Sequence, residues 1–380
     1  MRVLTFLHSF EAGGVERVAL RLVRHWREIG VDAQLFVGRP DGALRDEVAR
    51  DLRYDLPFRV PRRAAWFETW WMIVCLPRQI RRTRPDILFC AGSTYTVVAI
   101  AMKLLLRGDC PPVVAKISND VARGDLPRAM RGLWFAWLRL QAHFIDHWVV
   151  MQKGIEDEAR KALGARSITV VPDPAISLAQ IASRSPAPRY RESREGRRFV
   201  AVGRLVAQKD YPLMLRAFAR SAEDGDTLTI VGDGAQAAQL GRLARSLAIE
   251  DNVRFAGHVP DAAARLRDYD VLLMSSAYEG VPAALIEALA VAMPIIVTDC
   301  GRGVRELLAN GRLGTIVDRD VVSFISAISA ASLARPSAQP LINQARTFTI
   351  ESSAARYVDV FRATAFRGAA RPQDLSLANV

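Results

Sequence analysis

The sequence predicts an α/β protein with doubly wound parallel sheets, and three observations support this fold class. Short apolar stretches recur along the chain, as expected of strands that are buried on both faces of a parallel sheet. Amphipathic stretches with helical periodicity separate them, so strands and helices alternate. The chain of 380 residues also exceeds the usual size of one hydrophobic core, which predicts two such domains.

A polar stretch near the middle of the chain marks the domain boundary. Residues 183–197 are rich in proline and arginine and lack periodicity, which is typical of a linker. We therefore expect a first domain over residues 1–182 and a second over 198–350. An amphipathic helix is predicted at 351–366, followed by a frayed tail over 367–380.

The first domain opens with a buried strand over residues 2–7 and an amphipathic helix that follows Gly13 and Gly14. Glycines at this first turn let backbone N–H groups approach a ligand closely. An ordinary tight turn is the alternative explanation. The other elements predicted here are a helix over 94–106 and strands over 31–38, 86–92, 111–118, 146–151 and 167–174.

The second domain repeats the alternation of strands and helices. Ligands of such sheets bind at the carboxyl ends of the strands, so the residues after each strand are the first candidates for a site. The predicted strands are 198–203, 227–231, 253–256, 270–274, 294–298 and 314–317, and the predicted helices are 211–221, 235–248, 262–267, 283–291 and 303–309.

The amino-acid composition limits which cellular compartment and which classes of binding partner are expected. The net charge of +12 favours nucleic acid, anionic lipid or phosphorylated ligands, and a GC-rich genome that prefers arginine is the alternative explanation. The four cysteines lack metal-like spacing, which is typical of a reducing cytoplasm. The sequence shows no signal peptide and no run of about 18 apolar residues. We expect a cytoplasmic protein without a membrane-spanning helix.

Two stretches, residues 61–84 and 123–148, combine tryptophan with arginine. This combination favours the bilayer interface, so one interpretation is peripheral association with the anionic inner face of the cytoplasmic membrane. Buried helices with solvated arginines are the alternative. No basic motif recurs at the spacing of a nucleic-acid module, so we expect no nucleic acid partner.

The stretch from Ser275 to Asp299 carries the clearest candidate site. Glu279 lies in a predicted turn, and Glu287 lies about two helical turns further on, where it can face back toward that turn. Helix capping by Glu279 and a surface position for Glu287 are the alternative. The first N–H groups of the helix suit an anion, and the residues there are Gly280, Val281, Pro282, Ala283 and Ala284.

Two other turns of the second domain carry phosphate-type signals. Arg204 and Lys209 follow Gly203 at a strand end, where a guanidinium fork and an ammonium group can clamp a diphosphate. Gly232 and Gly234 match a dinucleotide fingerprint, which would indicate an enzyme of the NAD type. The acidic residue that should end the next strand is misplaced, and this argues against NAD.

Together these motifs resemble the GT-B glycosyltransferases, specifically the retaining glycosyltransferase family 4, group 1. The resemblance covers nearly the whole chain and is most specific in the second half. The matching elements, in the family's order and spacing, are the glycine loop at 13–14, G-R-x-x-x-x-K at 203–209, G-x-G at 232–234, the strand at 252–259 and E-x7-E at 279–287.

The resemblance implies roles for charged residues of the second domain. Arg204 and Lys209 would hold the donor diphosphate and stabilise the negative charge of the departing nucleotide. Glu287 would accept hydrogen bonds from the ribose hydroxyls. Glu279, with the backbone N–H groups after it, would contact the hydroxyls of the donor sugar.

The resemblance also implies contacts with the base and from the first domain. Gly13 and Gly14 would line the donor phosphate and the acceptor side of a cleft that two Rossmann-like domains face. The helix at 351–366 would pack back on the first domain. The backbone that would face the base, together with the turn before it, comprises Gly232, Gly257, His258 and Val259.

One position departs from the family pattern. Many relatives carry a histidine after the strand that ends here in Ser118, Asn119 and Asp120. Either Asn119 or Asp120 takes over the polar contact with the donor sugar, or the acceptor chemistry is arranged differently. Asp120 could act as a base toward an acceptor hydroxyl, and a helix N-cap is the alternative. His8 is the one histidine placed for the cleft.

The resemblance therefore implies a retaining glycosyltransferase that needs no metal and no other cofactor. Its donor would be a nucleotide diphosphate sugar, either a UDP-hexose or a UDP-N-acetylhexosamine. The acceptor would be a glycan or a lipid-linked glycan of surface polysaccharide or lipopolysaccharide assembly. The alternatives are a nucleotide-sugar epimerase of the same fold, which would carry more acid/base groups, and the NAD-type enzyme.

Overall fold

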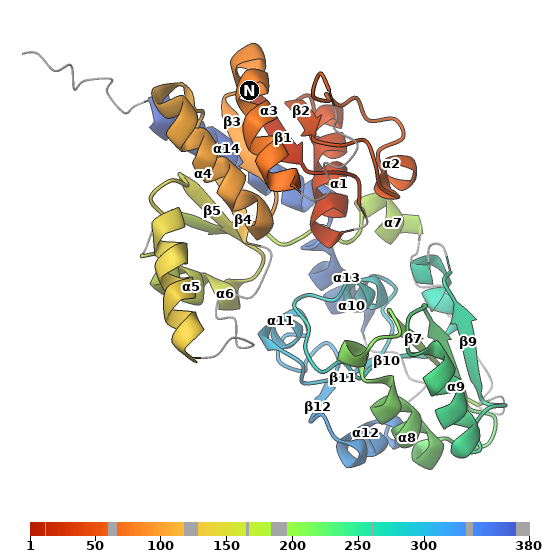
Figure 1. Cartoon of the computed structure of the whole chain (residues 1–380). Helices are drawn as coiled ribbons and strands as arrows, with labels where there is room; N and C mark the ends of the chain where they lie inside the picture. The colour runs from red at the N-terminus through yellow and green to blue at the C-terminus, as the bar shows by residue number, and fades with distance from the viewer. Residues whose placement is uncertain are drawn as a thin grey trace, which may run out of the picture. The chain divides into compact units, whose positions relative to one another are not determined.

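The computed structural model describes residues 1–11, 13–59, 67–117, 128–164, 167–183, 196–259, 262–331 and 337–369. The chain divides into two compact units, Met1–Pro174 with Ile350–Val380, and Ala175–Thr349. Each unit contains one parallel sheet of six strands with helices packed on it (Figure 1). The predicted fold class is therefore confirmed.

In the first unit the sheet order is β2-β1-β3-β4-β5-β6, and every pair is parallel. Strands β3, β4 and β5 are buried along their whole length because helices cover both faces of the sheet. The strands are β1 (Arg2–Leu7), β2 (Asp32–Val37), β3 (Ile87–Cys90), β4 (Val113–Ile117), β5 (His147–Val150) and β6 (Ile168–Val170).

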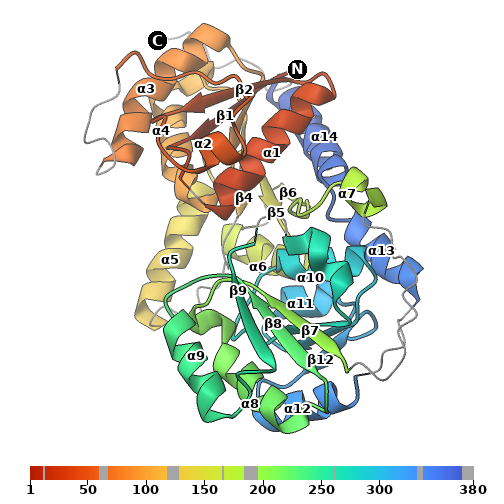
Figure 2. The same cartoon turned by 90° about the vertical axis from the view of Figure 1, so that its right-hand side faces the viewer.

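The helices of the first unit lie on opposite faces of this sheet. The link from β1 to β2 runs in one direction across the sheet, and the links onward to β5 run in the other. Right-handed crossovers therefore put α1 on one face and α3, α4 and α5 on the other, as Figure 2 shows. The helices are α1 (Gly14–Glu28), α2 (Leu44–Glu47), α3 (Glu68–Thr83), α4 (Thr96–Leu106), α5 (Arg128–Gln141), α6 (Lys153–Leu163) and α14 (Ile350–Ala369), with short 3-10 turns η2 (Ser93–Tyr95) and η3 (Arg107–Asp109).

The last helix, α14, belongs to the core of the first unit. The Trp26 ring of α1 lies 5.1 Å from the Phe361 ring and 5.8 Å from the Tyr357 ring. The Trp26 indole N–H also donates to the backbone oxygen of Ala354 at 3.2 Å. Because Trp26, Tyr357 and Phe361 are fully buried, α14 supplies apolar surface that the sheet needs on this face.

In the second unit the sheet order is β12-β11-β10-β7-β8-β9, again parallel throughout. The strands are β7 (Arg198–Val202), β8 (Thr227–Val231), β9 (Val253–Gly257), β10 (Val271–Met274), β11 (Ile295–Thr298) and β12 (Thr315–Val317). The helices are α7 (Leu178–Ser183), α8 (Tyr211–Ser221), α9 (Ala237–Ser246), α10 (Ala283–Ala290), α11 (Arg302–Leu307), α12 (Val321–Ser329) and α13 (Ala338–Arg346), with 3-10 turns η4 (Ala207–Lys209) and η5 (Ala262–Asp268).

The boundary between the units differs from the prediction. The first unit ends at Pro174, whereas the sequence suggested 182. The reason is that α7 packs on α13 in the second unit, where Ile181 is buried. Most of the predicted linker, residues 184–195, lies outside the described residues, as does the tail from 370 onward.

Helices α12 and α13 were missed by the sequence analysis. Asp320 caps α12, because its side chain accepts the backbone N–H of Ser323 at 2.9 Å. An Asp followed by a largely apolar run is a helix-start signal that could have revealed this element. Among the described helices, none is both long and apolar enough to cross a bilayer.

Candidate functional site

The topology of the second sheet points to a ligand crevice between β7 and β10. The chain enters this sheet at β7, builds outward to β9 on one side, and then builds from β10 to β12 on the other. Ligands of such sheets bind where the strand order reverses, outside the carboxyl ends of the two strands. Gly203 follows β7 and Ser275 follows β10, so two of the predicted motifs meet at this point.

An ion pair joins the two motifs. Lys209 Nζ lies 2.5 Å from Glu279 Oε1, and the two side chains are only 17% and 11% exposed. The sequence analysis assigned both residues to the donor but did not predict that they pair. Their positions after neighbouring strands of a doubly wound sheet are the signal that could have shown it.

Backbone and hydroxyl groups hold both partners of this pair in place. The Gln208 backbone oxygen accepts the Ala277 N–H at 2.7 Å, so the turn after β7 is bonded to the loop after β10. The Ser275 hydroxyl lies 2.8 Å from the Lys209 backbone oxygen. The Glu279 N–H donates to the Cys300 backbone oxygen at 2.8 Å. The Glu279 carboxylate therefore lies on a loop that hydrogen bonds to neighbouring segments hold in place.

Tyr211 lies beneath the pair. Its hydroxyl donates to the Gly203 backbone oxygen at 2.9 Å. Burial, and then the Glu279 carboxylate, raise the pKa of the Tyr211 hydroxyl above its ordinary value. Tyr211 therefore stays protonated and fixes the turn at Gly203 as a neutral donor.

Arg204 differs from Lys209 in its surroundings. Its side chain is exposed, and within the described part of the chain it makes no hydrogen bond or ion pair. The guanidinium of Arg204 therefore keeps all its donors for a ligand at the end of β7. The Lys209 ammonium has three N–H groups, and one of them donates a hydrogen bond to Glu279.

The glycines of the G-x-G turn are explained by packing within the protein. Gly232 has φ 145°, and a Cβ there would lie 2.0 Å from the Gly203 backbone oxygen. A Cβ at Gly234 would lie 2.5 Å from the Leu205 backbone oxygen. Both glycines let the turns after β7 and β8 touch, so the fingerprint requires no dinucleotide.

Helix α10 starts beside the ion pair. Pro282 precedes its first turn, and no side chain caps it in the described structure. Ala283 and Ala284 begin the helix, and the turn before it holds Gly280 and Val281. Its first backbone N–H groups can thus donate hydrogen bonds to an anionic ligand.

Glu287 lies in the interior of α10 and is half-buried.

The predicted residues Gly257, His258 and Val259 lie at the end of β9. The Gly257 backbone oxygen accepts the Gly232 N–H at 2.8 Å, which holds the turn after β8 against β9. His258 is exposed and Val259 is half-buried.

In the first unit Gly13 and Gly14 stand at the start of α1, as predicted. A Cβ at Gly13 would lie 1.8 Å from a carboxylate oxygen of Glu16, which folds back over the helix start. Glu16 in turn accepts the Tyr95 hydroxyl at 2.6 Å. Asn119 and Asp120 lie outside the described residues.

His8, at the end of β1, is held as a neutral imidazole. Its side chain is 13% exposed, and its Nδ1 lies 4.0 Å from Glu68 Oε2. Burial, and then the charge of Arg39, lower the pKa of His8 to about 4. Arg39 is itself engaged with Glu68, Glu11 and Asp41.

No group of three or more His, Cys, Asp or Glu side chains suitable for a metal occurs in the described part of the chain. That the site works without a metal or other cofactor stays a prediction.

Two family profiles match the chain. "Glycosyltransferase Family 4" matches residues 12–175, and "Glycosyl transferases group 1" matches residues 196–332. The chain belongs to this glycosyltransferase family. The first profile includes β2 to β6 of the first sheet, and the second includes all strands of the second sheet, so the resemblance seen in the motifs extends over both units.

Curated relatives of this glycosyltransferase are similar over different lengths. An uncharacterized glycosyltransferase of Methanocaldococcus jannaschii is 36% identical over 29% of this chain and 28% of its own length. The aligned part spans about a third of the length of the first curated relatives. The lipopolysaccharide core biosynthesis glycosyltransferase LpsE of Rhizobium meliloti is 25% identical over 86% of this chain and 87% of its own.

Solved structures show the same fold. The lipopolysaccharide outer core galactosyltransferase WaaB superposes with a TM-score of 0.71 and 18% identity, covering 96% of this chain and 99% of its own. HepE of Anabaena in complex with UDP gives 0.75 and 16% identity, covering 96% of this chain and 100% of its own. The fold of this glycosyltransferase is therefore GT-B, as the motifs indicated.

Proposed function

We propose that this protein transfers a hexose or N-acetylhexosamine from a UDP-sugar to a glycan or lipid-linked acceptor, with retention at the anomeric carbon. The Lys209–Glu279 pair at the switch point of the second sheet carries the proposal, because a cation that suits a diphosphate and a carboxylate that suits sugar hydroxyls lie together there. The name of LpsE and the UDP complex of HepE support the acceptor and donor classes.

In the proposed reaction the bond between the sugar anomeric carbon and the UDP oxygen breaks, and the acceptor oxygen bonds to that carbon. The acceptor hydroxyl releases its proton to solvent, and UDP leaves with one additional negative charge. Arg204, Lys209 and the first N–H groups of α10 stabilise this charge. Their arrangement before the reaction matters, because fixed donors need no reorganisation as the charge develops.

Glu279 has two functions in this scheme. One carboxylate oxygen positions the Lys209 ammonium, at 2.5 Å. A carboxylate has two oxygens and accepts several hydrogen bonds, so Glu279 can also receive a hydroxyl of the donor sugar. Glu287 receives the ribose hydroxyls, and the backbone at Gly257 faces the base.

Thermal stabilisation by nucleotides tests the donor class. At a ligand concentration about 100 times its dissociation constant, the unfolding free energy rises by about 2.7 kcal/mol. We expect stabilisation by UDP and none by NAD. Stabilisation by NAD, and by neither UDP nor GDP, would replace the proposal by the NAD-type alternative.

The transfer itself is tested with a panel of UDP-sugars and a crude lipid acceptor fraction. We expect product from a UDP-hexose or a UDP-N-acetylhexosamine. The anomeric configuration of that product, measured by nuclear magnetic resonance, should equal that of the donor. An inverted product would refute retention while leaving the donor assignment intact.

A further inference from the structure

One outer face of the first unit is apolar. It is formed by α3, α4 and α5, which lie together on one face of the sheet (Figure 2). Each helix exposes large apolar side chains, and the most exposed is Leu133, at 75%. These residues, which we call the α3–α5 face, are Trp70, Val74, Val97, Leu104, Leu105, Met130, Leu133 and Leu140.

The second unit has no comparable face in its described part. Only Leu178, Tyr278 and Val322 are exposed large apolar residues there, and they come from separate elements. Scattered exposed apolar side chains are ordinary on a soluble surface, whereas their concentration on helices that cover one face of a sheet indicates an interaction surface.

The charge of the α3–α5 face has one sign. In sequence, α3, α4 and α5 together contain one acidic residue, Glu68, and its carboxylate is engaged by Arg39. Lys103 pairs with Asp146 at 2.7 Å. Among the side chains of these helices that the structure describes, the exposed basic ones are Arg78, Arg81, Arg82 and Arg139. The three helices therefore offer cations and apolar groups with no carboxylate besides Glu68, and the Asp55 carboxylate beside α3 pairs with Arg82.

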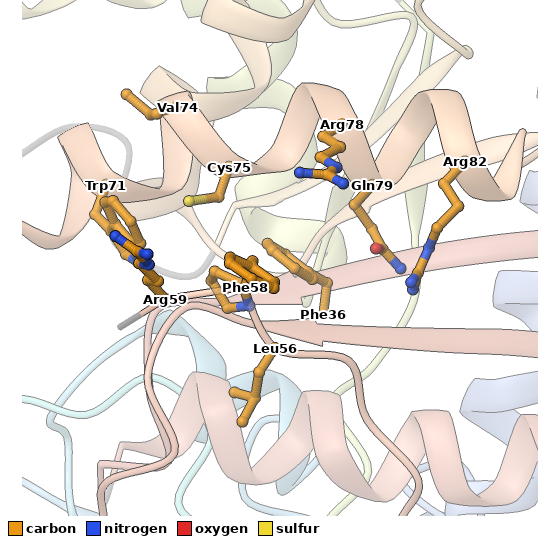
Figure 3. Close-up of a pocket in the computed structure, with 11 residues that line it drawn as sticks. Phe36, Leu56, Phe58, Arg59, Trp71, Val74, Cys75, Arg78, Gln79 and Arg82 are labelled. Atoms are coloured by element: carbon orange, nitrogen blue, oxygen red, sulfur yellow. The ribbon is translucent and has the colours of Figure 1, made fainter. Parts of the chain in front are cut away.

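A pocket of about 470 Å³ lies beside α3 (Figure 3). Arg78, Gln79 and Arg82 point from the helix toward the segment that carries Phe58. Gln79 Nε2 lies 2.6 Å, and an Arg82 guanidinium nitrogen 3.0 Å, from Asp55 Oδ2, which fixes this wall. The remaining walls include Phe36, Trp71 and Arg59.

The pocket suits an anionic head attached to an apolar chain. Three guanidinium groups, from Arg59, Arg78 and Arg82, line it together with aromatic rings. The Trp71 indole N–H is buried and has no hydrogen-bond partner within the described structure. A buried donor without a partner is unfavourable, and Trp71 is one of the residues that line the pocket.

We propose that the α3–α5 face binds an anionic phospholipid bilayer, with one lipid phosphate held in the pocket beside α3. Helices with exposed aromatic and aliphatic side chains and basic flanks lie in the bilayer interface without spanning it. A nucleic acid would leave Leu104, Leu105 and Leu133 unburied. The binding needs no sugar donor, so it can be tested separately from the transfer reaction.

Co-sedimentation with vesicles tests the proposal directly. We expect the full chain to bind vesicles of phosphatidylglycerol and phosphatidylcholine in equal parts, and not vesicles of phosphatidylcholine alone. Binding should fall as sodium chloride rises from about 0.05 M to about 0.5 M, because salt screens the attraction. Failure to bind the anionic vesicles at low salt would overturn the proposal.

A pair of matched variants locates the bilayer contact. Leu133→Glu puts an acid on the α3–α5 face, whereas Val322→Glu makes the same change at a site of the second unit that is 70% exposed. Losing the burial of one leucine and adding one repelling charge should weaken vesicle binding by about tenfold or more in the first variant only. Equal binding by both variants would refute this face.

A second pair tests the basic residues. Arg78→Gln with Arg139→Gln should weaken binding to anionic vesicles by about tenfold, since each basic residue near the surface contributes. The control, Arg45→Gln with Arg50→Gln, removes the same charge elsewhere in the first unit and should have little effect. Light scattering tests whether a second copy of the chain, instead of a bilayer, covers the α3–α5 face. If the protein is a dimer and Leu133→Glu converts it to a monomer, the face belongs to a dimer interface and the proposal is overturned.

Discussion

At the scale of single residues, the candidate site contains one cation that is paired and one that is not. Lys209 is held by Glu279, and both are mostly buried. Arg204 is exposed and makes no ion pair within the described residues. Substitutions at these two positions should therefore separate stability from ligand binding.

Lys209→Met should lower both activity and stability. Removing one partner of a mostly buried ion pair leaves the other charge unpaired, which costs about 3 kcal/mol of unfolding free energy. The double variant with Glu279→Gln should recover most of this stability but no activity, because the charge at the diphosphate is still absent. Denaturant unfolding and a transfer assay measure the two effects. A double variant that regains activity would show that Lys209 serves only to neutralise Glu279.

Arg204→Gln should leave stability unchanged, since the side chain makes no contact to lose. UDP affinity should fall by about tenfold or more, because a charge-assisted hydrogen bond to phosphate is worth about 1.5–3 kcal/mol. Calorimetric titration with UDP measures this. Arg216→Gln, an exposed change on α8, is the control and should bind UDP normally. Equal affinities for the two variants would exclude Arg204 from the site.

His8 should make the protein less stable in acid. Its pKa is lowered to about 4 in the fold, against 6.5 when exposed, so the unfolded chain binds the proton more strongly. Stability is unaffected above about pH 6.5 and falls as the pH drops toward 4. At pH 5 this residue alone should cost about 2 kcal/mol. The effect should be missing in His8→Gln, so the difference in unfolding free energy between the two proteins should change between pH 7 and pH 5. A constant difference would contradict the burial argument.

At the scale of elements, local pattern was enough for most of the alternation. Strands such as Ile87–Cys90 are apolar throughout, and sequence alone revealed them. Helix α13 was missed because Pro340 lies in its first turn. A proline in a sequence suggests that a helix is interrupted, although proline is tolerated in the first turn. The Lys209–Glu279 pair joins residues 70 positions apart, and no local pattern encodes such a contact.

The turn after β8 offers a test at this scale. Gly232→Ala should destabilise the second unit and weaken UDP binding, because φ is 145° and the new Cβ would lie 2.0 Å from the Gly203 backbone oxygen. We expect a loss of about 2 kcal/mol or more, measured by thermal unfolding. Gly241→Ala is the control, since its Cβ would meet no atom within 4 Å inside α9. That variant should gain up to about 1 kcal/mol from helix propensity. If both alanines were tolerated alike, the close approach of the two turns would be refuted.

At the scale of the whole molecule, the chain builds two separate cores and returns its last helix to the first. The core of the first unit contains Phe361 and Tyr357 of α14 beside Trp26. The second unit has apolar clusters of its own, formed by residues between Ile176 and Phe348. Changes in α14 should therefore affect the first unit, while UDP binding, which we propose for the second unit, should stay unchanged.

Phe361→Ala tests this separation of the cores. Phe361 is fully buried, and its ring lies 5.1 Å from Trp26 and 5.6 Å from Phe89, so truncation should cost the first unit about 3–5 kcal/mol. Phe366→Ala, on the same helix but 78% exposed, should cost little. Thermal unfolding with and without UDP distinguishes the units, because UDP stabilises only the unit that binds it. If Phe361→Ala weakened UDP binding as strongly as it lowered stability, the two units would have to fold as one, and the donor site would depend on the helix that closes the other core.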